Sequence, residues 1–164
     1  MRLIADSKPE RSRQYAPVVN TGPSPVFSRD DASGAGIDQD ISSQILIVED
    51  DYLIAMQAED ALSEAGFTLT GIAASADEAI ALARTHRPVL AIMDIRLVGK
   101  RDGIDAALEL FRTQNIHCIF ATAHADRTVM ERAAPARPLA WLQKPYTVQS
   151  LVAAVRAALD ELTS

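Results

Sequence analysis

The chain has 164 residues, a formal net charge of −6, and hydrophobic residues at 48% of its positions. Such a length and apolar content are sufficient for one ordinary packed domain. The acidic balance argues against a dedicated nucleic-acid binder, and the one cysteine, Cys118, excludes a disulfide framework or a cysteine-rich zinc site. No apolar run approaches the roughly 18 residues of a membrane span, and the first residues lack the apolar centre of a secretory signal. We expect a soluble, cytoplasmic protein without a membrane or nucleic-acid partner.

Residues 1–43 differ in composition from the rest of the chain. They contain four of the eight prolines and three of the seven glycines, with no sustained apolar period. A segment so poor in apolar side chains does not offset the entropy lost on ordering. We expect a flexible N-terminal tail over 1–43, either an inert extension or a partner-docking segment, followed by one folded domain over 44–163.

From residue 44 onward, short aliphatic runs alternate with segments of helical spacing. The expected strands lie within 44–49, 69–74, 89–94, 116–122 and 139–143, and the expected helices within 52–66, 76–86, 103–114, 125–133 and 148–162. Gly66 is the expected C-cap of the first helix, and Ser75, with Glu78 three residues later, the expected N-cap of the second. Five strand–helix units predict a small doubly wound α/β domain, with a parallel sheet covered by helices on both faces.

Polar side chains stand where four of these expected strands end. They are Glu49, Asp50, Asp51, Asp94, Thr122 and Lys144. In open parallel sheets, ligands bind outside the carboxyl ends of the strands, where the strand order reverses. The carboxylates therefore either face solvent or hold a cation at this edge.

Each of these residues also has an ordinary explanation when it is taken alone. Asp50 or Asp51 could cap the first helix, and Asp94 could open a turn. The Thr122 hydroxyl could cap a local turn, and Lys144 could be a solvated loop residue. The combination at four strand ends, in this order, favours a functional site over four unrelated surface features.

The motifs ILIVEDD, AIMD, DGIDAA, IFAT and QKPY follow one another between about residues 44 and 162. In this order, the chain resembles the CheY-like receiver domain of two-component response regulators. The resemblance implies a flavodoxin-like sheet with strand order 2-1-3-4-5. It also implies that an aspartate accepts a phosphoryl group in a reaction that depends on Mg²⁺ or Mn²⁺.

Carried over residue by residue, the resemblance implies that Asp94 is the phosphoacceptor. Glu49 and Asp50 match the acidic pair that holds the divalent cation together with Asp94, and the backbone carbonyl of Arg96 would be a further ligand. Thr122 matches the hydroxyl residue that acts as a switch in this family, and Lys144, in the QKPY motif, matches the lysine of the family's active site. The peptide bond before Pro145 is expected to be cis, and Asp51 is left to cap the first helix.

Three further residues have less definite roles in this comparison. Trp141 is expected either to couple its rotamer to Thr122 or only to pack against a helix. Arg96 and His124 each lie two residues beyond a motif residue, where side chains tune the lifetime of the phosphoryl group. The loop from 94 to 103 lacks the usual Met-Pro, and its Gly99, Lys100 and Arg101 predict a mobile loop, an acidic-partner contact or a solvated turn.

The resemblance implies a stand-alone, phosphorylation-controlled switch, because the chain ends soon after the fifth helix. Its partners would be a sensor histidine kinase or a histidine phosphotransfer protein and a downstream protein, with a homodimer through the fourth helix, fifth strand and fifth helix as an option. It would phosphorylate and dephosphorylate only itself. An aspartyl phosphatase of the haloacid-dehalogenase type would need an acid where Arg96 stands, and a flavodoxin would not carry an acidic first loop. A receiver that binds partners without phosphorylation is the remaining alternative.

Overall fold

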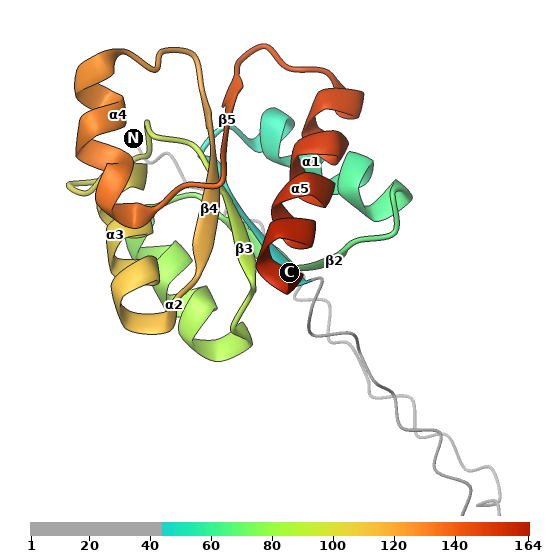
Figure 1. Cartoon of the computed structure of the whole chain (residues 1–164), viewed down its shortest axis with the longest axis horizontal. Helices are drawn as coiled ribbons and strands as arrows, with labels where there is room; N and C mark the ends of the chain where they lie inside the picture. Colours follow the sequence, from blue (N-terminus) through green and yellow to red (C-terminus); the bar gives the residue numbers. More distant parts are fainter. Residues whose placement is uncertain (1–43) are drawn as a thin grey trace, which may run out of the picture. The chain divides into compact units, whose positions relative to one another are not determined.

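The computed structural model describes residues 44–164, in which five β-strands and five α-helices alternate (Figure 1). The elements are β1 (Gln44–Val48), α1 (Tyr52–Glu64), β2 (Thr68–Ala73), α2 (Ala76–His86), β3 (Leu90–Met93), α3 (Gly103–Gln114), β4 (His117–Thr122), α4 (Arg127–Ala133), β5 (Ala140–Gln143) and α5 (Val148–Thr163). A short 3₁₀ helix, η2 (Ala134–Ala136), follows α4. The predicted tail over 1–43 lies outside the described residues.

All strand pairs are parallel, and the sheet order is β2-β1-β3-β4-β5. This confirms the predicted doubly wound α/β fold and its strand order. Val48 pairs with Met93, and Thr122 pairs with Gln143, so β1, β3, β4 and β5 end at the same edge of the sheet. The polar residues that follow these strands are therefore brought together by the register.

The sheet is covered on both faces, because successive strand side chains point to opposite sides. Leu46, Val48 and Phe120 belong to the core beneath α2, α3 and α4. Ile45 and Ile47, from the alternate positions, belong to the core beneath α1 and α5. Figure 1 shows the two helical layers on either side of the strands. Burial on both faces explains why the strand sequences are continuously apolar.

Short polar side chains fix where the helices begin. Asp51 caps α1 by accepting from the backbone N–H of Leu53 at 2.9 Å and of Ile54 at 3.2 Å, and Ser75 accepts from Glu78 at 3.2 Å. These caps match the expectations for both helices. The end of α1 differs: Ala65 is the C-cap, and Gly66, the predicted cap, follows it at φ 89°. The left-handed conformation that favours glycine thus lies one residue beyond the cap.

Helix α4 is short, and a proline follows it closely. Asp126 caps α4 by accepting from Val129 N–H at 2.9 Å, and Pro135 lies in η2 immediately afterward. Cys118 is buried in the core, where burial raises the pKa of its thiol to about 12. None of the helices in residues 44–164 has the length and hydropathy needed to cross a bilayer.

Candidate functional site

Three carboxylates meet at the carboxyl edge of the sheet. Glu49 and Asp50 follow β1, and Asp94 follows β3, the neighbouring strand. One carboxylate oxygen from each lies within 4.8 Å of the others. Glu49 and Asp94 are buried, whereas Asp50 is exposed. The sequence prediction that β1 and β3 bring these acids together is thus met by the geometry.

Lys144, which directly follows β5, reaches into this cluster. Its Nζ donates to Asp94 Oδ2 at 2.7 Å and to Glu49 Oε2 at 2.5 Å. If all four groups are ionised, three carboxylates and one ammonium leave two negative charges without compensation. Burial makes such an imbalance costly, because charges resist transfer from water unless they are paired.

The proton affinities of the site reflect this balance. Burial raises the pKa of the Glu49 carboxyl, and Asp94 adds to the effect, although the hydrogen bond from Lys144 opposes it. Burial lowers the pKa of the Lys144 ammonium, but the hydrogen bonds and charges of Asp94 and Glu49 outweigh this, so its pKa is raised. Burial also raises the pKa of the neighbouring Tyr146 hydroxyl. Lys144 is therefore held as a cation, while the cluster favours additional positive charge.

The donor set fits a hard divalent cation. Carboxylate oxygens are the ligands that Mg²⁺, Mn²⁺ and Ca²⁺ prefer, and the excess negative charge supplies an electrostatic reason to bind one. Glu49, Asp50 and Asp94 could each supply one oxygen. Arg96 lies beside them: its backbone N–H donates to Asp94 Oδ1 at 3.2 Å, and its side chain is exposed.

Thr122 lies at the end of β4, and its backbone is hydrogen-bonded to that of Lys144. Its carbonyl accepts from Lys144 N–H at 2.9 Å. Its buried hydroxyl donates to the His124 carbonyl at 3.2 Å and accepts from His124 N–H at 3.3 Å. The hydroxyl is thus held by the β4–α4 loop, whereas the His124 side chain is exposed.

Trp141 lies on the β5 strand and is half-buried. Its ring packs on Phe120 of the adjacent strand, with centroids 4.8 Å apart and an interplanar angle of 30°. This contact belongs to the core beneath α2, α3 and α4. Phe120 and Trp141 are paired across β4 and β5, so their rings lie on the same face of the sheet.

The remaining sequence predictions for this edge concern Pro145 and Asp51. The Lys144–Pro145 peptide bond is cis. Asp51 caps α1, as expected, and its own backbone N–H donates to Glu49 Oε1 at 3.2 Å. Asp51 therefore stabilises the helix start and also helps to orient Glu49.

Gly103, the first residue of α3, is a positioning residue that sequence reasoning did not single out. A Cβ at this position would lie 1.8 Å from the carbonyl oxygen of Asp94 and 2.8 Å from its carbonyl carbon. Its N–H also donates to the Ile95 carbonyl at 2.9 Å. The start of α3 therefore lies directly against the backbone of Asp94, which only glycine permits.

Arg101, in the loop before α3, makes contacts that the loop motif did not predict. It donates to Glu109 at 2.7 Å and to Asp77 at 3.4 Å. Gly99 and Lys100 are exposed, as a turn requires. The charges at 77 and 109 lie too far away along the sequence for the loop motif to reveal these contacts.

Arg132 of α4 also contacts this region, again without a local sequence signal. It donates to both carboxylate oxygens of Asp102, at 2.5 Å and 2.9 Å, and to Asp105 at 2.8 Å. Asp102 and Asp105 form the capping box of α3. The spacing of the two acids was visible in the sequence, but their cation comes from another helix.

Comparison with known proteins adds three kinds of similarity. Residues 45–156 match the family model of the response regulator receiver domain. The transcriptional regulatory protein PdtaR of Mycobacterium tuberculosis is 37% identical over 123 residues, covering 75% of this chain and 60% of PdtaR. The phyllosphere-induced regulator PhyR of Methylorubrum extorquens is 34% identical, covering 79% of this chain and 48% of PhyR. The chain thus spans roughly half to three-fifths of the length of these two relatives.

Solved structures agree with this family match. The signal receiver domain of a modulated diguanylate cyclase from Desulfovibrio desulfuricans has a TM-score of 0.69 and 31% identity, covering 73% of this chain and 95% of that one. A CheY-like receiver domain from Methanospirillum hungatei has a TM-score of 0.69 and 26% identity, covering 74% and 96%. With the strand order and the acidic edge described above, the chain belongs to the response regulator receiver domain family.

Proposed function

We propose that this receiver domain is a phosphorylation-controlled switch whose phosphoacceptor is Asp94. The donor would be a histidine kinase or a histidine phosphotransfer protein. The observation that supports this most is the position of Asp94: buried at the end of β3, bonded to Lys144, and within the carboxylate cluster. An isolated turn-forming aspartate would not need a buried cation.

In the proposed transfer, a carboxylate oxygen of Asp94 attacks phosphorus and forms an acyl phosphate. The phosphorus–nitrogen bond to the donor histidine breaks, and the imidazole leaves with its electron pair and is protonated. Arg96 N–H and Lys144 Nζ, which bond to the two Asp94 oxygens, hold the carboxylate in one orientation. Lys144 then donates to a phosphoryl oxygen, where its positive charge stabilises the transferred group.

We infer that Mg²⁺, or Mn²⁺, is the natural cofactor of this edge. When bound, it supplies positive charge that offsets the carboxylates and the phosphoryl oxygens. Glu49, Asp50 and Asp94 would hold it, with the Arg96 carbonyl as a further ligand. Both carboxylate oxygens of Glu49 already accept hydrogen bonds, one from Lys144 Nζ and one from Asp51 N–H. Glu49 would therefore hold the cation either directly or through an ordered water.

Thr122 is the proposed sensor of the phosphoryl group. Its hydroxyl would exchange the carbonyl of His124 for a phosphoryl oxygen, which would release the β4–α4 loop. The Trp141 ring, which packs on Phe120, would then change its rotamer. Arg96 and His124 have exposed side chains at the rim of the site, where they would affect access of water to the acyl phosphate.

Exposed apolar side chains surround the acidic edge, which fits docking of a protein donor. Tyr52 and Leu53 of α1 are each 71% exposed. Lys144, Tyr146 and Val148 also line a cavity of about 390 Å³ between α1 and α5. A partner that buries these groups would exclude water while it delivers the phosphoryl group. We propose that such docking occurs in the cytoplasm, and that the chain reacts with no substrate other than its own aspartate.

The test uses the Asp94→Asn variant, which keeps the size of the side chain and removes the nucleophilic carboxylate. Both proteins are incubated with Mg²⁺ and a small acyl phosphate, and the intact mass is followed with time. Wild type is expected to gain one phosphoryl group, and Asp94→Asn none. Asp51→Asn, which alters the adjacent helix cap, is the matched control and is expected to react like wild type. Equal phosphorylation of the Asp94→Asn variant would overturn the assignment.

A further inference from the structure

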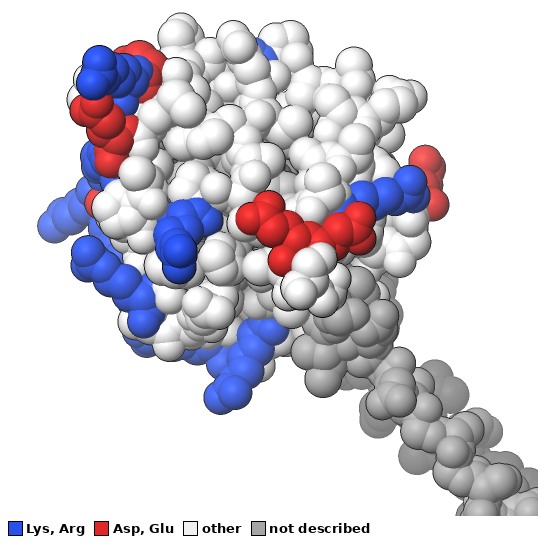
Figure 2. Space-filling view, in the orientation of Figure 1, with Lys and Arg blue, Asp and Glu red and all other residues white. Residues whose placement is uncertain are grey.

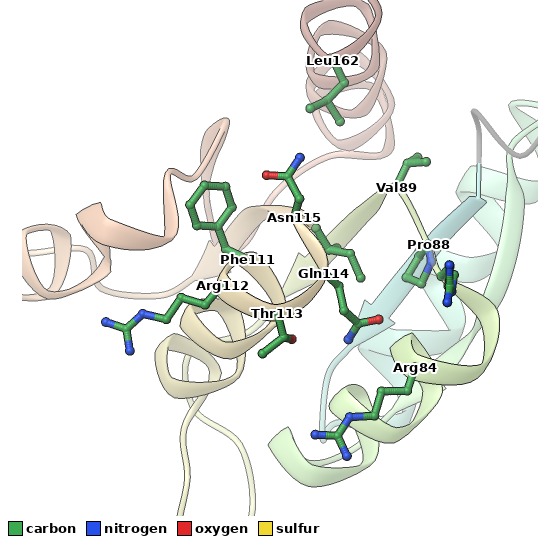
Figure 3. A pocket seen from close by; sticks show the side chains of 11 residues that line it. Arg84, Pro88, Val89, Phe111, Arg112, Thr113, Gln114, Asn115 and Leu162 are labelled. Carbon is green, nitrogen blue, oxygen red and sulfur yellow. The ribbon is translucent and has the colours of Figure 1, made fainter.

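The edge of the sheet opposite Asp94 carries a second cavity. It lies below the start of β3, between the ends of α2, α3 and α5, and has a volume of about 1030 Å³ (Figure 3). We call it the basal groove; it is lined by Arg84, Arg87, Pro88, Val89, Phe111, Arg112, Thr113, Gln114, Asn115, Ile116 and Leu162. This volume is at the upper limit of pockets for drug-sized ligands, roughly 300–1,000 Å³, and is open enough for a chain segment.

The groove combines a cationic rim with an apolar floor. Arg87 and Arg112 have no ion-pair partner within residues 44–164, and Arg84 has only the exposed Glu109, at 3.3 Å. Figure 2 shows Lys and Arg side chains gathered at the lower left of the view, on the side of α2, α3 and α4. The apolar side chains of the lining, which we call the floor, are Pro88, Val89, Phe111, Ile116 and Leu162. The matching ligand would carry carboxylates beside apolar groups.

Gln114 provides an independent indication that the groove is unfilled. Its Nε2 is buried and has no hydrogen-bond acceptor among the described residues. Figure 3 shows this amide reaching between Pro88 and Arg84, whereas Arg112 points away from them. Buried donors are almost always paired, and because this nitrogen has almost no exposed surface, its side chain must turn toward the groove to bond an acceptor there.

The chain itself enters the domain at the rim of this groove. The carbonyl of Gln44, the first described residue, accepts a hydrogen bond from Val89 N–H at 2.9 Å. Val89 lines the groove. Whatever precedes Gln44 is therefore covalently held beside the groove, at a high effective concentration.

The sequence just before Gln44 has the matching chemistry. Residues 37–41 read Ile-Asp-Gln-Asp-Ile, so acids at 38 and 40 alternate with isoleucines at 37 and 41. In an extended chain, this period of two would place the acids on one side and the isoleucines on the other. At about 3.3 Å per residue, the seven residues from 37 to 43 would extend over roughly 23 Å.

We propose that the segment 37–43 occupies the basal groove, with Asp38 and Asp40 paired to Arg84 and Arg87 and with Ile37 and Ile41 on the apolar floor. A carboxylate or backbone carbonyl of the segment accepts from Gln114 Nε2. The segment is favoured over an acidic peptide from another protein because it is covalently joined to Gln44, whose carbonyl accepts a hydrogen bond from Val89 N–H in the groove. This interaction lies at the far edge of the sheet from Asp94 and does not depend on the proposed phosphorylation.

The test follows the Gln114 side-chain amide and the Asn115 backbone amide by ¹H–¹⁵N NMR in the full chain. The double variant Asp38→Lys/Asp40→Lys is expected to shift both signals and to speed exchange of the Gln114 amide protons with water. Asp30→Lys/Asp31→Lys makes the same change of charge earlier in the chain and is expected to leave them unchanged. Unshifted signals in the first variant, or equal shifts in both, would overturn the proposal.

A charge swap tests the pairing itself. Arg84→Glu/Arg87→Glu is expected to shift the Gln114 amide as the Asp38/Asp40 variant does, and combining the four changes is expected to restore it toward the wild-type position. Arg156→Glu, on α5 outside the groove, is the control. Failure of the combined variant to restore the signal would refute the ion pairs.

A mixed sample identifies whose segment is bound. An unlabelled chain carrying a nitroxide on Ala35→Cys is mixed with unmodified ¹⁵N-labelled chain; Cys118 is buried, so the new cysteine reacts alone. Intramolecular docking predicts no broadening of Gln114 or Asn115 in the mixture, but strong broadening when the label is on the ¹⁵N chain. Broadening in the mixture would assign the groove to a second copy and overturn the proposal.

Discussion

Two clusters in this domain have the same composition, one cation between two carboxylates, but different surroundings. Lys144 lies between Glu49 and Asp94, and these side chains are 16%, 6% and 11% exposed. Arg132 lies between Asp102 and Asp105, and these are 45%, 31% and 39% exposed. Water therefore screens the charges of the second cluster and is largely excluded from the first.

The comparison shows why similar contacts serve different purposes. Exposed ion pairs contribute roughly 0–1 kcal/mol, because water already solvates each partner. Buried charges lose that solvation, so the Lys144 cluster is stable only if the charges nearly balance. The two carboxylates already outnumber the one ammonium, and Asp50 adds a third, exposed carboxylate beside them. The Arg132 cluster joins α4 to α3, whereas the Lys144 cluster is the site at which we propose that a cation and a phosphoryl group bind.

The largest effect is expected from Lys144→Gln. The variant removes the positive charge that would stabilise the transferred phosphoryl group, and the rate of phosphorylation by a small acyl phosphate should fall on the order of 100-fold. The rate is measured by intact mass at fixed Mg²⁺. Lys100→Gln, in the exposed loop after Asp94, is the control and should react normally. A phosphorylation rate of Lys144→Gln close to that of wild type would show that the positive charge of the buried cluster is not needed for phosphoryl transfer.

A smaller effect is expected from Asp50→Asn on binding of Mg²⁺. Loss of one charged ligand should weaken the affinity by about tenfold, equivalent to about 1.4 kcal/mol. Asp51→Asn is the matched control, because asparagine caps helices as well as aspartate does and Asp51 lies outside the three-carboxylate cluster. Calorimetric titration of both variants separates metal binding from helix capping. Equal losses would show that only the overall charge matters.

Thr122→Ala tests whether ligand binding at the buried cluster changes the packing of Trp141 in the core. Trp141 is the only tryptophan, so its fluorescence reports on the Phe120 contact. Addition of Mg²⁺ and beryllofluoride should change the emission of wild type and of Thr122→Ser, which retains the hydroxyl, but much less that of Thr122→Ala. An identical change in all three proteins would separate Trp141 from the hydroxyl.

The smallest effect is expected from Arg132→Gln, which should lower the free energy of unfolding by less than about 1 kcal/mol at neutral pH. Partial burial raises the pKa of Asp102, but its bonds to Arg132 and to the α3 backbone outweigh this and lower it. Such stabilisation is present above the ordinary aspartate pKa of about 3.9 and is lost as the pH falls through the lowered native value.

Urea denaturation should therefore show wild type and Arg132→Gln converging in stability as the pH is lowered below about 4. Arg127→Gln, which breaks the more exposed pair with Glu131 on the same helix, is the control and should show a smaller difference throughout. A difference for Arg132→Gln that persisted at low pH would place its origin in packing of the long side chain, and would weaken the contrast between the clusters.

The parts that could be predicted from sequence are those with local causes. The apolar runs ending in Glu49 and Asp94 gave the strand ends, and Asp51 and Ser75 gave the helix starts, because a cap bonds residues two or three positions away. The predicted C-cap of α1 was wrong by one residue: Ala65 is the cap, and the left-handed Gly66 follows it. Sequence patterns place a helix end only to within one or two residues.

The parts that could not be predicted depend on contacts across the fold. Lys144 bonds Glu49 across 95 residues, and Arg132 bonds Asp102 across 30. The first contact was implied only by resemblance to a family in which such residues are known to meet. The second had no such guide, so Arg101 and Arg132 were not recognised as structural residues until the helices were placed in space.

Gly103 has a consequence for how this domain can move. Because its missing side chain lets α3 lie against the carbonyl of Asp94, the start of the helix is in close contact with the backbone of the proposed phosphoacceptor. We expect a displacement of the Asp94 backbone toward α3 to shift the first turn of this helix, where Asp102 and Asp105 accept hydrogen bonds from Arg132 of α4. These contacts link Asp94 to α4 by a route separate from the proposed switch at the Thr122 hydroxyl, and the route depends on a residue without a side chain.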